Sequence, residues 1–198
     1  MSTEFANYNE YAAFTKSRDW GAIFQLNGLS VDSFGTKKEL NVLGDYLEDD
    51  EVVFALASGI MSQTGTSNLT DFGANTWLVA LTNERFLFLD HAMLTSSVDT
   101  QSVRHESVQA VSASQGLIFG KIQVDLGARV IVIDNCQKAT VKVIADLANK
   151  WIRIFNQQSK QTAGASSQET LDLAQAQINN QLRIISLLEE IRDHVSVR

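Results

Sequence analysis

The stretch WLVALTNERFLFLD, residues 77–90, constrains the fold more than any other part of the sequence. Two strongly apolar runs flank four polar residues, Thr82, Asn83, Glu84 and Arg85, with no glycine or proline among them. This pattern predicts two antiparallel strands joined at Asn83-Glu84. A two-residue turn requires positive φ, which asparagine tolerates better than most residues. We therefore expect a nearly fully buried hairpin near the centre of the chain.

Further short strands surround this hairpin. Residues 52–57 are apolar, and the polar residues 62–75 that follow are expected to form a long hairpin loop. Strands are also expected at 95–104, 107–114, 117–126 and 128–134, with bends or bulges at Gly116, Gly120 and Gly127. Because no helical pattern separates these strands, they indicate an antiparallel meander. The expected core residues are Trp77, Val79 and Leu81 or their alternates, with Phe119, Ile122 and Val124.

Helical patterns stand on both sides of the strands. Residues 3–26 carry four regularly spaced aromatic residues, which either dock this arm on the main domain or form a face for a partner chain: Phe5, Tyr8, Tyr11 and Phe14. Thr36 and Glu39 fit a capping box at the start of a short helix. After Asp134 the apolar period returns to 3.6, which predicts an amphipathic helix that covers the open side of the sheet. Its apolar face comprises Val141, Ile144, Ala145, Ala148, Ile152 and Phe155.

The last part of the chain predicts a separate amphipathic helix. Residues 156–166 are a polar linker, and a helical period runs from about 167 to 194 within the segment 167–198. Its broad apolar face includes Leu171, Ile178, Leu182, Ile185, Leu188 and Ile191. This face can pack on its own domain or on the same helix of a second chain. We expect self-association, because so many apolar side chains are costly to leave in water.

Charge and cysteine content limit the partners and the compartment. The 198 residues carry a net charge of −7, and no segment is basic, so nucleic acid is excluded as a partner and a membrane is disfavoured. No run of about 18 apolar residues is available for a membrane span, and the N-terminus lacks the features of a secretory signal. The single cysteine, Cys136, favours a reducing compartment. The cytoplasm is therefore the expected location.

Catalytic and metal-binding patterns are weak. The histidines His91, His105 and His194 are far apart, and none belongs to a metal-binding pair, so we expect no catalytic, metal or cofactor residues. Cys136 stands where a helix start would favour a thiolate, but without an evident partner it is expected to be a packed thiol. Residues 48–51 (EDDE) are expected to form a solvated turn, since they lack the spacing of a calcium loop. Residues 116–121 (GLIFGK) have an apolar middle, which predicts a bend with a core phenylalanine rather than a phosphate loop.

Four segments, in order along the chain, resemble the bacterial pleckstrin-homology-like (PH-like) domain family. They are EVVFALASG (51–59), LVALTNERFLFLD (78–90), SASQGLIFGKIQV (112–124) and IDNCQK (133–138), and the similarity spans about residues 34–155. The resemblance implies an α+β fold with a barrel of about seven antiparallel strands closed by a helix. It also implies self-assembly or partner binding, but not phosphoinositide recognition.

The chain also departs from this family. Residues 62–75 look longer than the usual first hairpin, and residues 91–95 (HAMLT) replace a glycine-rich, often basic segment. Phosphoinositide recognition in eukaryotic relatives depends on basic residues in the first hairpin, whereas residues 62–75 contain Asp71 and neither Lys nor Arg. The arm (1–33), the linker (156–166) and the last helix (167–198) lie outside the resemblance. We therefore expect a cytoplasmic homo-oligomeric module that binds a protein partner, with lipid headgroup binding as the alternative.

Overall fold

The computed structural model describes residues 5–33, 35–65, 69–91, 97–157 and 175, and only the backbone of residues 63–65 and 69–74. The chain divides into two compact units, Met1–Phe155 and Asn156–Arg198. Most described residues belong to the first unit, and the N-terminal arm is part of it. The residues expected to join subunits, Leu171, Ile178, Leu182, Ile185, Leu188 and Ile191, lie outside the described residues.

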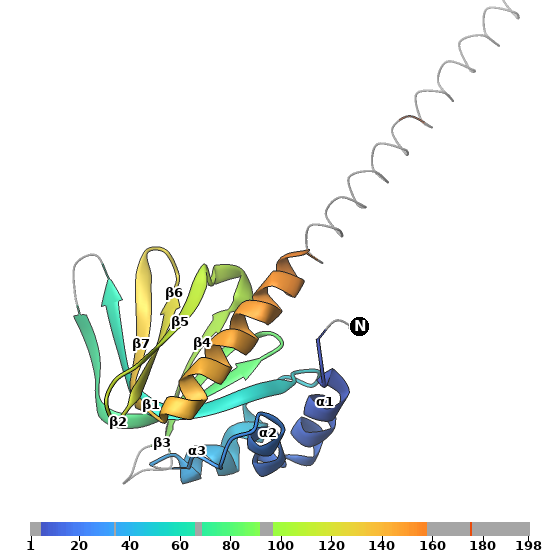
Figure 1. Ribbon diagram of the computed structural model, residues 1–198, viewed down its shortest axis with the longest axis horizontal. Helices are drawn as coiled ribbons and strands as arrows, with labels where there is room; N and C mark the ends of the chain where they lie inside the picture. The colour runs from blue at the N-terminus through green and yellow to red at the C-terminus, as the bar shows by residue number, and fades with distance from the viewer. Residues whose placement is uncertain (1–4, 34, 66–68, 92–96, 158–174, 176–198) are drawn as a thin grey trace, which may run out of the picture. The chain divides into compact units, whose positions relative to one another are not determined.

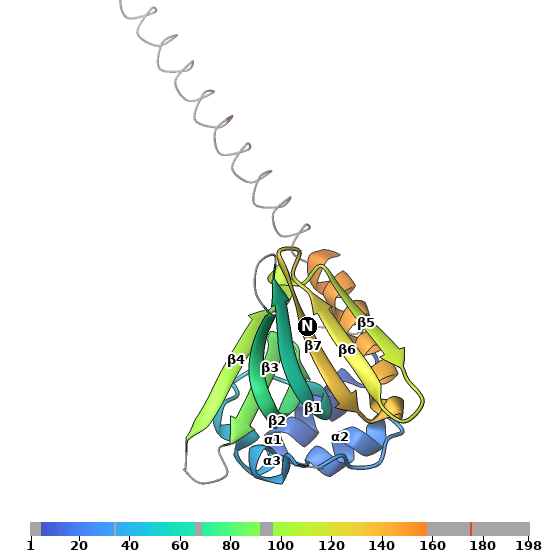
Figure 2. The same ribbon diagram turned by 90° about the vertical axis from the view of Figure 1, so that its left-hand side faces the viewer.

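The described strands form one antiparallel sheet in the order β4-β3-β2-β1-β7-β6-β5. Figure 2 shows the sheet bent into two walls, with β1 to β4 in one and β5 to β7 in the other. The α+β fold with about seven antiparallel strands that was expected from the sequence is confirmed. The strands are β1 (Val53–Gly65), β2 (Leu69–Thr82), β3 (Arg85–His91), β4 (Val98–Arg104), β5 (Ala110–Gln115), β6 (Gly120–Asp125) and β7 (Arg129–Cys136).

The polar stretch 62–75 is not a long loop, so that expectation was wrong. β1 and β2 continue through it, with Ser62 opposite Asp71 and Thr64 opposite Leu69. The reason is that β1 has a second neighbour over this length, because Ile60–Gly65 also pairs with Asp134–Arg129 of β7. Backbone hydrogen bonds on both sides hold a strand whose side chains are mostly polar.

Helices cover both faces of the central strands. The N-terminal helices contact β1, β2 and β3, and the closing helix (residues 138–157, orange in Figure 1) fills the space between the two walls. Leu78, Val79 and Ala80 are consequently all fully buried, although they point alternately to opposite faces. This double burial explains the unbroken apolar runs of the hairpin. The remaining elements are α1 (Tyr8–Ser17), α2 (Trp20–Leu26), α3 (Lys37–Val42) and the 3₁₀ turns η1 (Leu43–Asp45) and η2 (His105–Ser107).

The N-terminal arm is docked on the domain but is not a single helix. Arg18 adopts a left-handed conformation (φ 57°) that ends α1, and the side chain of Asp19 accepts a hydrogen bond from Ala22 N at the start of α2. The Phe5 and Tyr11 rings are buried and lie 4.5 and 5.5 Å from the Phe54 ring of β1. Through these contacts the arm forms part of the hydrophobic core.

The capping box expected at Thr36 and Glu39 is also absent. The Thr36 hydroxyl makes no capping hydrogen bond and instead lies 2.5 Å from the Ser58 hydroxyl in β1. Glu39 Oε1 accepts a hydrogen bond from His91 N, 2.8 Å away at the end of β3. Both side chains are buried, because α3 packs against the sheet and strand partners replace the helical ones. Tertiary contacts have overridden a local pattern.

Candidate functional site

The turn between β2 and β3 is built by side-chain hydrogen bonds. Thr82 Oγ1 accepts hydrogen bonds from the backbone N–H groups of Glu84 and Arg85, at 3.1 and 3.0 Å. Asn83 Oδ1 accepts another from Val52 N at 2.7 Å. Asn83 has a negative φ, so the sequence-based reason for an asparagine here was wrong. Its side-chain amide, rather than left-handed backbone, is what the turn requires.

Glu51 and Arg85 form the centre of this network. Arg85 Nε and Nη2 donate to the two carboxylate oxygens of Glu51 at 2.9 and 2.8 Å, and the Thr82 hydroxyl donates to Glu51 Oε1 at 2.7 Å. Burial alone would raise the pKa of Glu51, but the hydrogen bonds from Arg85, Glu48 N and Thr82 and the charge of Arg85 hold it below its ordinary value. Residues 48–51 are thus only partly a solvated turn, since Glu51 is buried.

The closing helix completes the same network. Trp151 Nε1 donates to Asn83 O at 2.7 Å, and the buried His105 donates through Nε2 to Thr82 O at 2.8 Å. Burial lowers the pKa of His105, and the Thr82 hydrogen bond only partly opposes that effect. The residues that carry the family resemblance here therefore stabilise the turn. They are engaged inside the protein and do not form a free binding surface.

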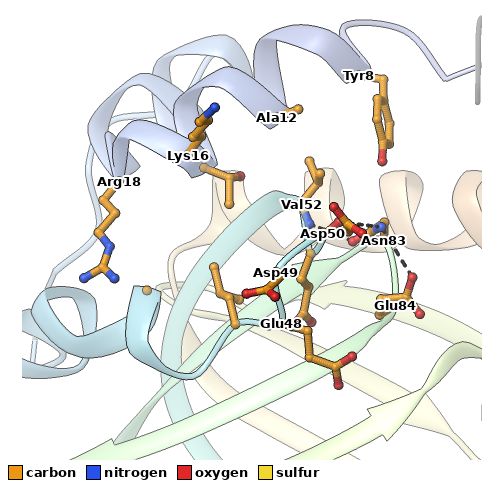
Figure 3. A pocket seen from close by; sticks show the side chains of 14 residues that line it. Tyr8, Ala12, Lys16, Arg18, Glu48, Asp49, Asp50, Val52, Asn83 and Glu84 are labelled. Carbon is orange, nitrogen blue, oxygen red and sulfur yellow. Dashed lines mark hydrogen bonds between the residues drawn. The ribbon is translucent and has the colours of Figure 1, made fainter.

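A cleft of about 810 Å³ lies beside this network, between α1 and the acidic turn. Figure 3 shows the Tyr8 side chain on α1 directed toward Asp50 and Asn83 across the cleft. Burial, together with the charges of Glu84 and Asp50, raises the pKa of the Tyr8 hydroxyl. A phenol held protonated beside carboxylates is a hydrogen-bond donor rather than a base.

Several carboxylates at this cleft already have cationic neighbours. Arg104 lies 3.6 Å from Glu48 and 3.8 Å from Glu84, and Arg18 pairs with Asp45 at 2.9 Å. Among the described residues, no group of three or more histidine, cysteine, aspartate or glutamate side chains could hold a metal ion. The cleft is therefore a polar surface on which Glu48 and Glu84 have arginine neighbours.

The turn between β5 and β6 has the opposite character. Leu117, Ile118 and Phe119 are 93%, 70% and 52% exposed, and we call these three residues the apolar tip. The expectation that Phe119 is a core residue was wrong, whereas Ile122 and Val124 are buried as expected. The cause is strand length, because β5 ends at Gln115 and β6 begins only at Gly120. Phe119 belongs to the connection and not to a strand with an inward face.

The apolar tip is held in one conformation by its surroundings. Gly116 N donates to Phe119 O at 2.8 Å, which closes the turn. Lys138 Nζ donates to Leu117 O at 3.0 Å, and Gln115 Nε2 donates to Lys138 O at 2.7 Å. These bonds fasten the tip to the start of the closing helix, as Figure 2 shows at the lower right. The exposure of the tip therefore belongs to an anchored turn.

A pocket of about 460 Å³ lies next to the apolar tip. Phe119 forms part of its wall, so tip and pocket are continuous. A side chain at Gly59 would come within 2.6 Å of Cys136 Sγ, so glycine is required where β1 passes β7. The other lining residues include Asp32, Ser58, Ile60 and Thr76. The exposed apolar residues of the tip thus adjoin a pocket that is lined by both apolar and polar residues.

The remaining sequence-based candidates lie elsewhere. Cys136 is a buried thiol whose pKa is raised to about 12 by burial and by Asp32 and Asp134, in line with a packed thiol and not with a thiolate. His194 lies outside the described residues. The four aromatic residues weighed as a partner face have contacts within this chain. Phe5 and Tyr11 are buried against Phe54, and the half-buried Tyr8 and Phe14 also pack against the core. The Tyr8 ring lies 6.0 Å from the Trp151 ring.

The sequence analysis did not predict that the apolar tip is exposed at the surface. The signal was present, because three large apolar residues between Gly116 and Gly120 form a segment too short for a strand of its own. Flanking glycines mark the ends of a turn, and turns lie at the surface. The pocket had no comparable signal, since its lining comes from five separate parts of the chain.

Comparison with known proteins identifies one family. Residues 47–150 match the family model described as "Bacterial PH domain", which covers about half of the chain. No curated protein matches the chain. Among the described residues, no helix has the length and apolar character needed to cross a membrane.

Solved structures of PH domains are distantly similar. The N-terminal PH domain of Vps36 is 10% identical, with 56% of this chain and 86% of that chain covered and a TM-score of 0.44. A protein with a pleckstrin-homology domain from Shewanella loihica is 17% identical, with coverages of 62% and 94% and a TM-score of 0.39. A pleckstrin homology domain from Shewanella amazonensis is 13% identical, with coverages of 50% and 80% and a TM-score of 0.29.

Proposed function

The chain belongs to the bacterial PH domain family, and from that membership we propose that it is a non-enzymatic cytoplasmic module that self-assembles and binds a protein partner. The observation that carries this proposal is the exposed apolar tip beside a pocket. Three neighbouring large apolar side chains are exposed and anchored at one edge of the domain. Exposed apolar surface next to a concavity is characteristic of contact with another macromolecule.

A protein partner is favoured over an anionic lipid headgroup. The chain carries a net charge of −7, and residues 62–75 at the first hairpin contain no Lys or Arg. Anionic headgroups are recognised by clustered cations, and a negative chain is repelled by an anionic surface. The compartment follows from the single cysteine, which favours a reducing environment.

Self-assembly is proposed through the segment 167–198. Its apolar positions Ile178, Leu182 and Ile185 recur at helical spacing. A charge at Leu182 or Ile185 introduces an unpaired group where apolar side chains meet, a change that costs several kcal/mol at a buried site. Assembly through this segment would therefore weaken in either variant.

Two measurements test the proposal on the full chain. Sedimentation equilibrium of wild type, Leu182→Asp and Ile185→Asp should show an oligomer whose mass falls in both variants. A wild-type chain that stays monomeric at tens of micromolar contradicts self-assembly. Co-sedimentation with phosphoinositide-containing vesicles at physiological salt should show negligible binding. Headgroup-selective binding at micromolar concentration would instead establish the lipid alternative.

A further inference from the structure

A small cavity of about 290 Å³ lies on the wall formed by β2, β3 and β4, away from the apolar tip. We propose that this cavity receives the guanidinium group of an arginine side chain presented by a protein partner. The inference rests on the proposed function for the kind of partner, and it adds a second site. The residues that line the cavity are Asn75, Trp77, Asp90, Asp99, Thr100 and Gln101.

The side chains that matter most project from one face of three neighbouring strands. Asp90 of β3 lies directly opposite Asp99 of β4, and opposite residues of an antiparallel pair point to the same side. Trp77 of β2 and Asp90 each adjoin one member of the pair Leu78–Leu89, so these two side chains also share a face. The strands therefore bring an indole and two carboxylates together from three separate parts of the sequence.

The two carboxylates have no cation from their own chain among the described residues. Directly opposite residues of an antiparallel pair have Cβ atoms about 4.5–5.5 Å apart, and like charges at that distance destabilise the pair. Neither Asp90 nor Asp99 forms an ion pair in the part of the chain that the structure describes. Residues 92–97 (AMLTSS), between β3 and β4 in the sequence, contain no lysine or arginine. A cation from a partner would therefore relieve a repulsion that these strands leave in place.

The two carboxylates differ in burial, which gives each a separate part in binding. Asp90 is 7% exposed, and its Oδ2 accepts a hydrogen bond from the Asn75 amide at 2.9 Å. No described group donates to the other oxygen, Oδ1, and a neutral amide leaves the charge of a buried carboxylate uncompensated. Asp99 is exposed, so its carboxylate is open to a partner. Asp99 thus supplies the accessible contact, and Asp90 adds a fixed negative charge behind it.

The lining favours a planar organic cation over a metal ion. Guanidinium groups bind carboxylates through parallel hydrogen bonds and stack on aromatic rings, and Trp77 forms part of the wall. Among the described residues, no group of three or more histidine, cysteine, aspartate or glutamate side chains could hold a metal ion. The volume of about 290 Å³ lies just below the range of about 300–1,000 Å³ that is typical of ligand pockets, so it suits the end of one side chain. The net charge of −7 also attracts a cationic partner.

The first test titrates the purified full-length chain with the peptide acetyl-Gly-Arg-Gly-amide and follows the indole N–H resonance of Trp77 by NMR. This resonance should shift with the peptide and reach saturation. A matched peptide in which citrulline replaces arginine keeps the shape of the side chain but lacks its charge. It should bind at least about 10-fold more weakly, because charge-assisted hydrogen bonds are lost. Equal affinities for the two peptides overturn the inference.

A pair of matched variants locates the site. Asp99→Asn removes one charge from the cavity and should weaken binding of the arginine peptide by at least about 10-fold. Asp146→Asn removes the same charge from an exposed position on the closing helix and should leave the affinity unchanged. Thermal unfolding should show that Asp99→Asn is at least as stable as wild type, because the repulsion with Asp90 is relieved. An unchanged affinity in Asp99→Asn overturns the inference.

Two further probes identify the class of cation. Methylguanidinium lacks the methylene groups that would pack on Trp77 and should bind more weakly than the arginine peptide, whereas equal affinity would assign the cavity to free small cations. Calcium chloride should not displace the peptide, and displacement by calcium at submillimolar concentration would assign the cavity to a metal ion. Either of these results overturns the inference. The titration needs no self-assembly, so a chain that stays monomeric in sedimentation equilibrium contradicts the proposed function without changing this result.

Discussion

The β2–β3 turn and the β5–β6 turn present opposite relations between composition and burial. The first consists of polar residues, yet Thr82 is fully buried and the Glu51 side chain that it contacts is inaccessible. The second consists of large apolar residues, yet Leu117 is 93% exposed. The difference lies in what packs against each turn. Residues 46–52, η2 and Trp151 surround the first, whereas the second is hydrogen-bonded to the start of the closing helix and stays largely uncovered.

This comparison separates residues that stabilise the domain from residues available to a partner. Removing one partner of a buried polar pair leaves the other partner unsatisfied, so the paired members of the first turn's network are costly to remove. An exposed apolar side chain contributes little to folding and can be replaced cheaply. The variants below measure that contrast, from the largest expected effect on stability to the smallest.

Removing the cation of the buried network should have the largest effect. In Arg85→Met the Glu51 carboxylate loses both of its hydrogen bonds from the guanidinium and stays buried. We expect the free energy of unfolding to fall by about 3–5 kcal/mol, as when one partner of a buried ion pair is removed. Urea denaturation of the full chain provides the measurement.

Two further variants control this experiment. Adding Glu51→Gln to Arg85→Met removes the isolated charge and should recover part of the loss. Arg104→Met removes a 57% exposed guanidinium from the same carboxylate cluster and should cost less than about 1 kcal/mol. Equal losses for Arg85→Met and Arg104→Met would show that the network is not effectively buried.

Truncation of the turn asparagine should have the next largest effect. Asn83→Ala leaves Val52 N without the acceptor that it contacts at 2.7 Å, next to a buried strand. An unsatisfied buried N–H costs about 1–3 kcal/mol. Asn83→Asp keeps the acceptor oxygen and should be milder, which thermal unfolding can measure. If Asn83→Gly were more stable than the wild type, a backbone role for this residue would be indicated instead.

Acidification should weaken the same end of the domain through His105. Its folded pKa lies below the unfolded value of about 6.5, so between the two the unfolded chain binds a proton that the folded chain does not. The free energy of unfolding should therefore fall as the pH drops below about 6.5, by at most about 1.4 kcal/mol per pH unit. His105→Gln should remove this component. An unchanged slope in that variant would assign the pH dependence to other groups.

The apolar tip should tolerate substitution best. Leu117→Ser removes an almost fully exposed side chain, so the free energy of unfolding of the dissociated chain should change by no more than about 0.5 kcal/mol. Chemical denaturation at low protein concentration measures this value. Ile122→Ser in the adjoining β6, which is fully buried, should cost several times more. A large loss at Leu117 would mean that the tip packs within its own chain.

Much of the domain was determined by the sequence alone, because the patterns concerned are local and repeated. The hairpin around Asn83, the antiparallel order of the strands and the buried face of the closing helix from Val141 to Ile152 follow from the spacing of apolar residues. Each such element buries a whole face of apolar residues. One residue that departs from the pattern therefore does not change the predicted strand or helix.

Other features were decided only by the tertiary structure, because each depends on partners distant in the sequence. β1 extends through polar residues because β7 pairs with it about seventy positions later. The Glu39 side chain accepts a hydrogen bond from His91 N instead of capping its own helix. The Glu51 carboxylate is buried beside the Arg85 guanidinium, which donates to it. Phe119 is exposed because β5 ends before it and β6 begins after it. Periodicity determines which residues share a face, but burial depends on what the rest of the chain places against that face. For this reason Leu117 is 93% exposed whereas Leu78 is fully buried.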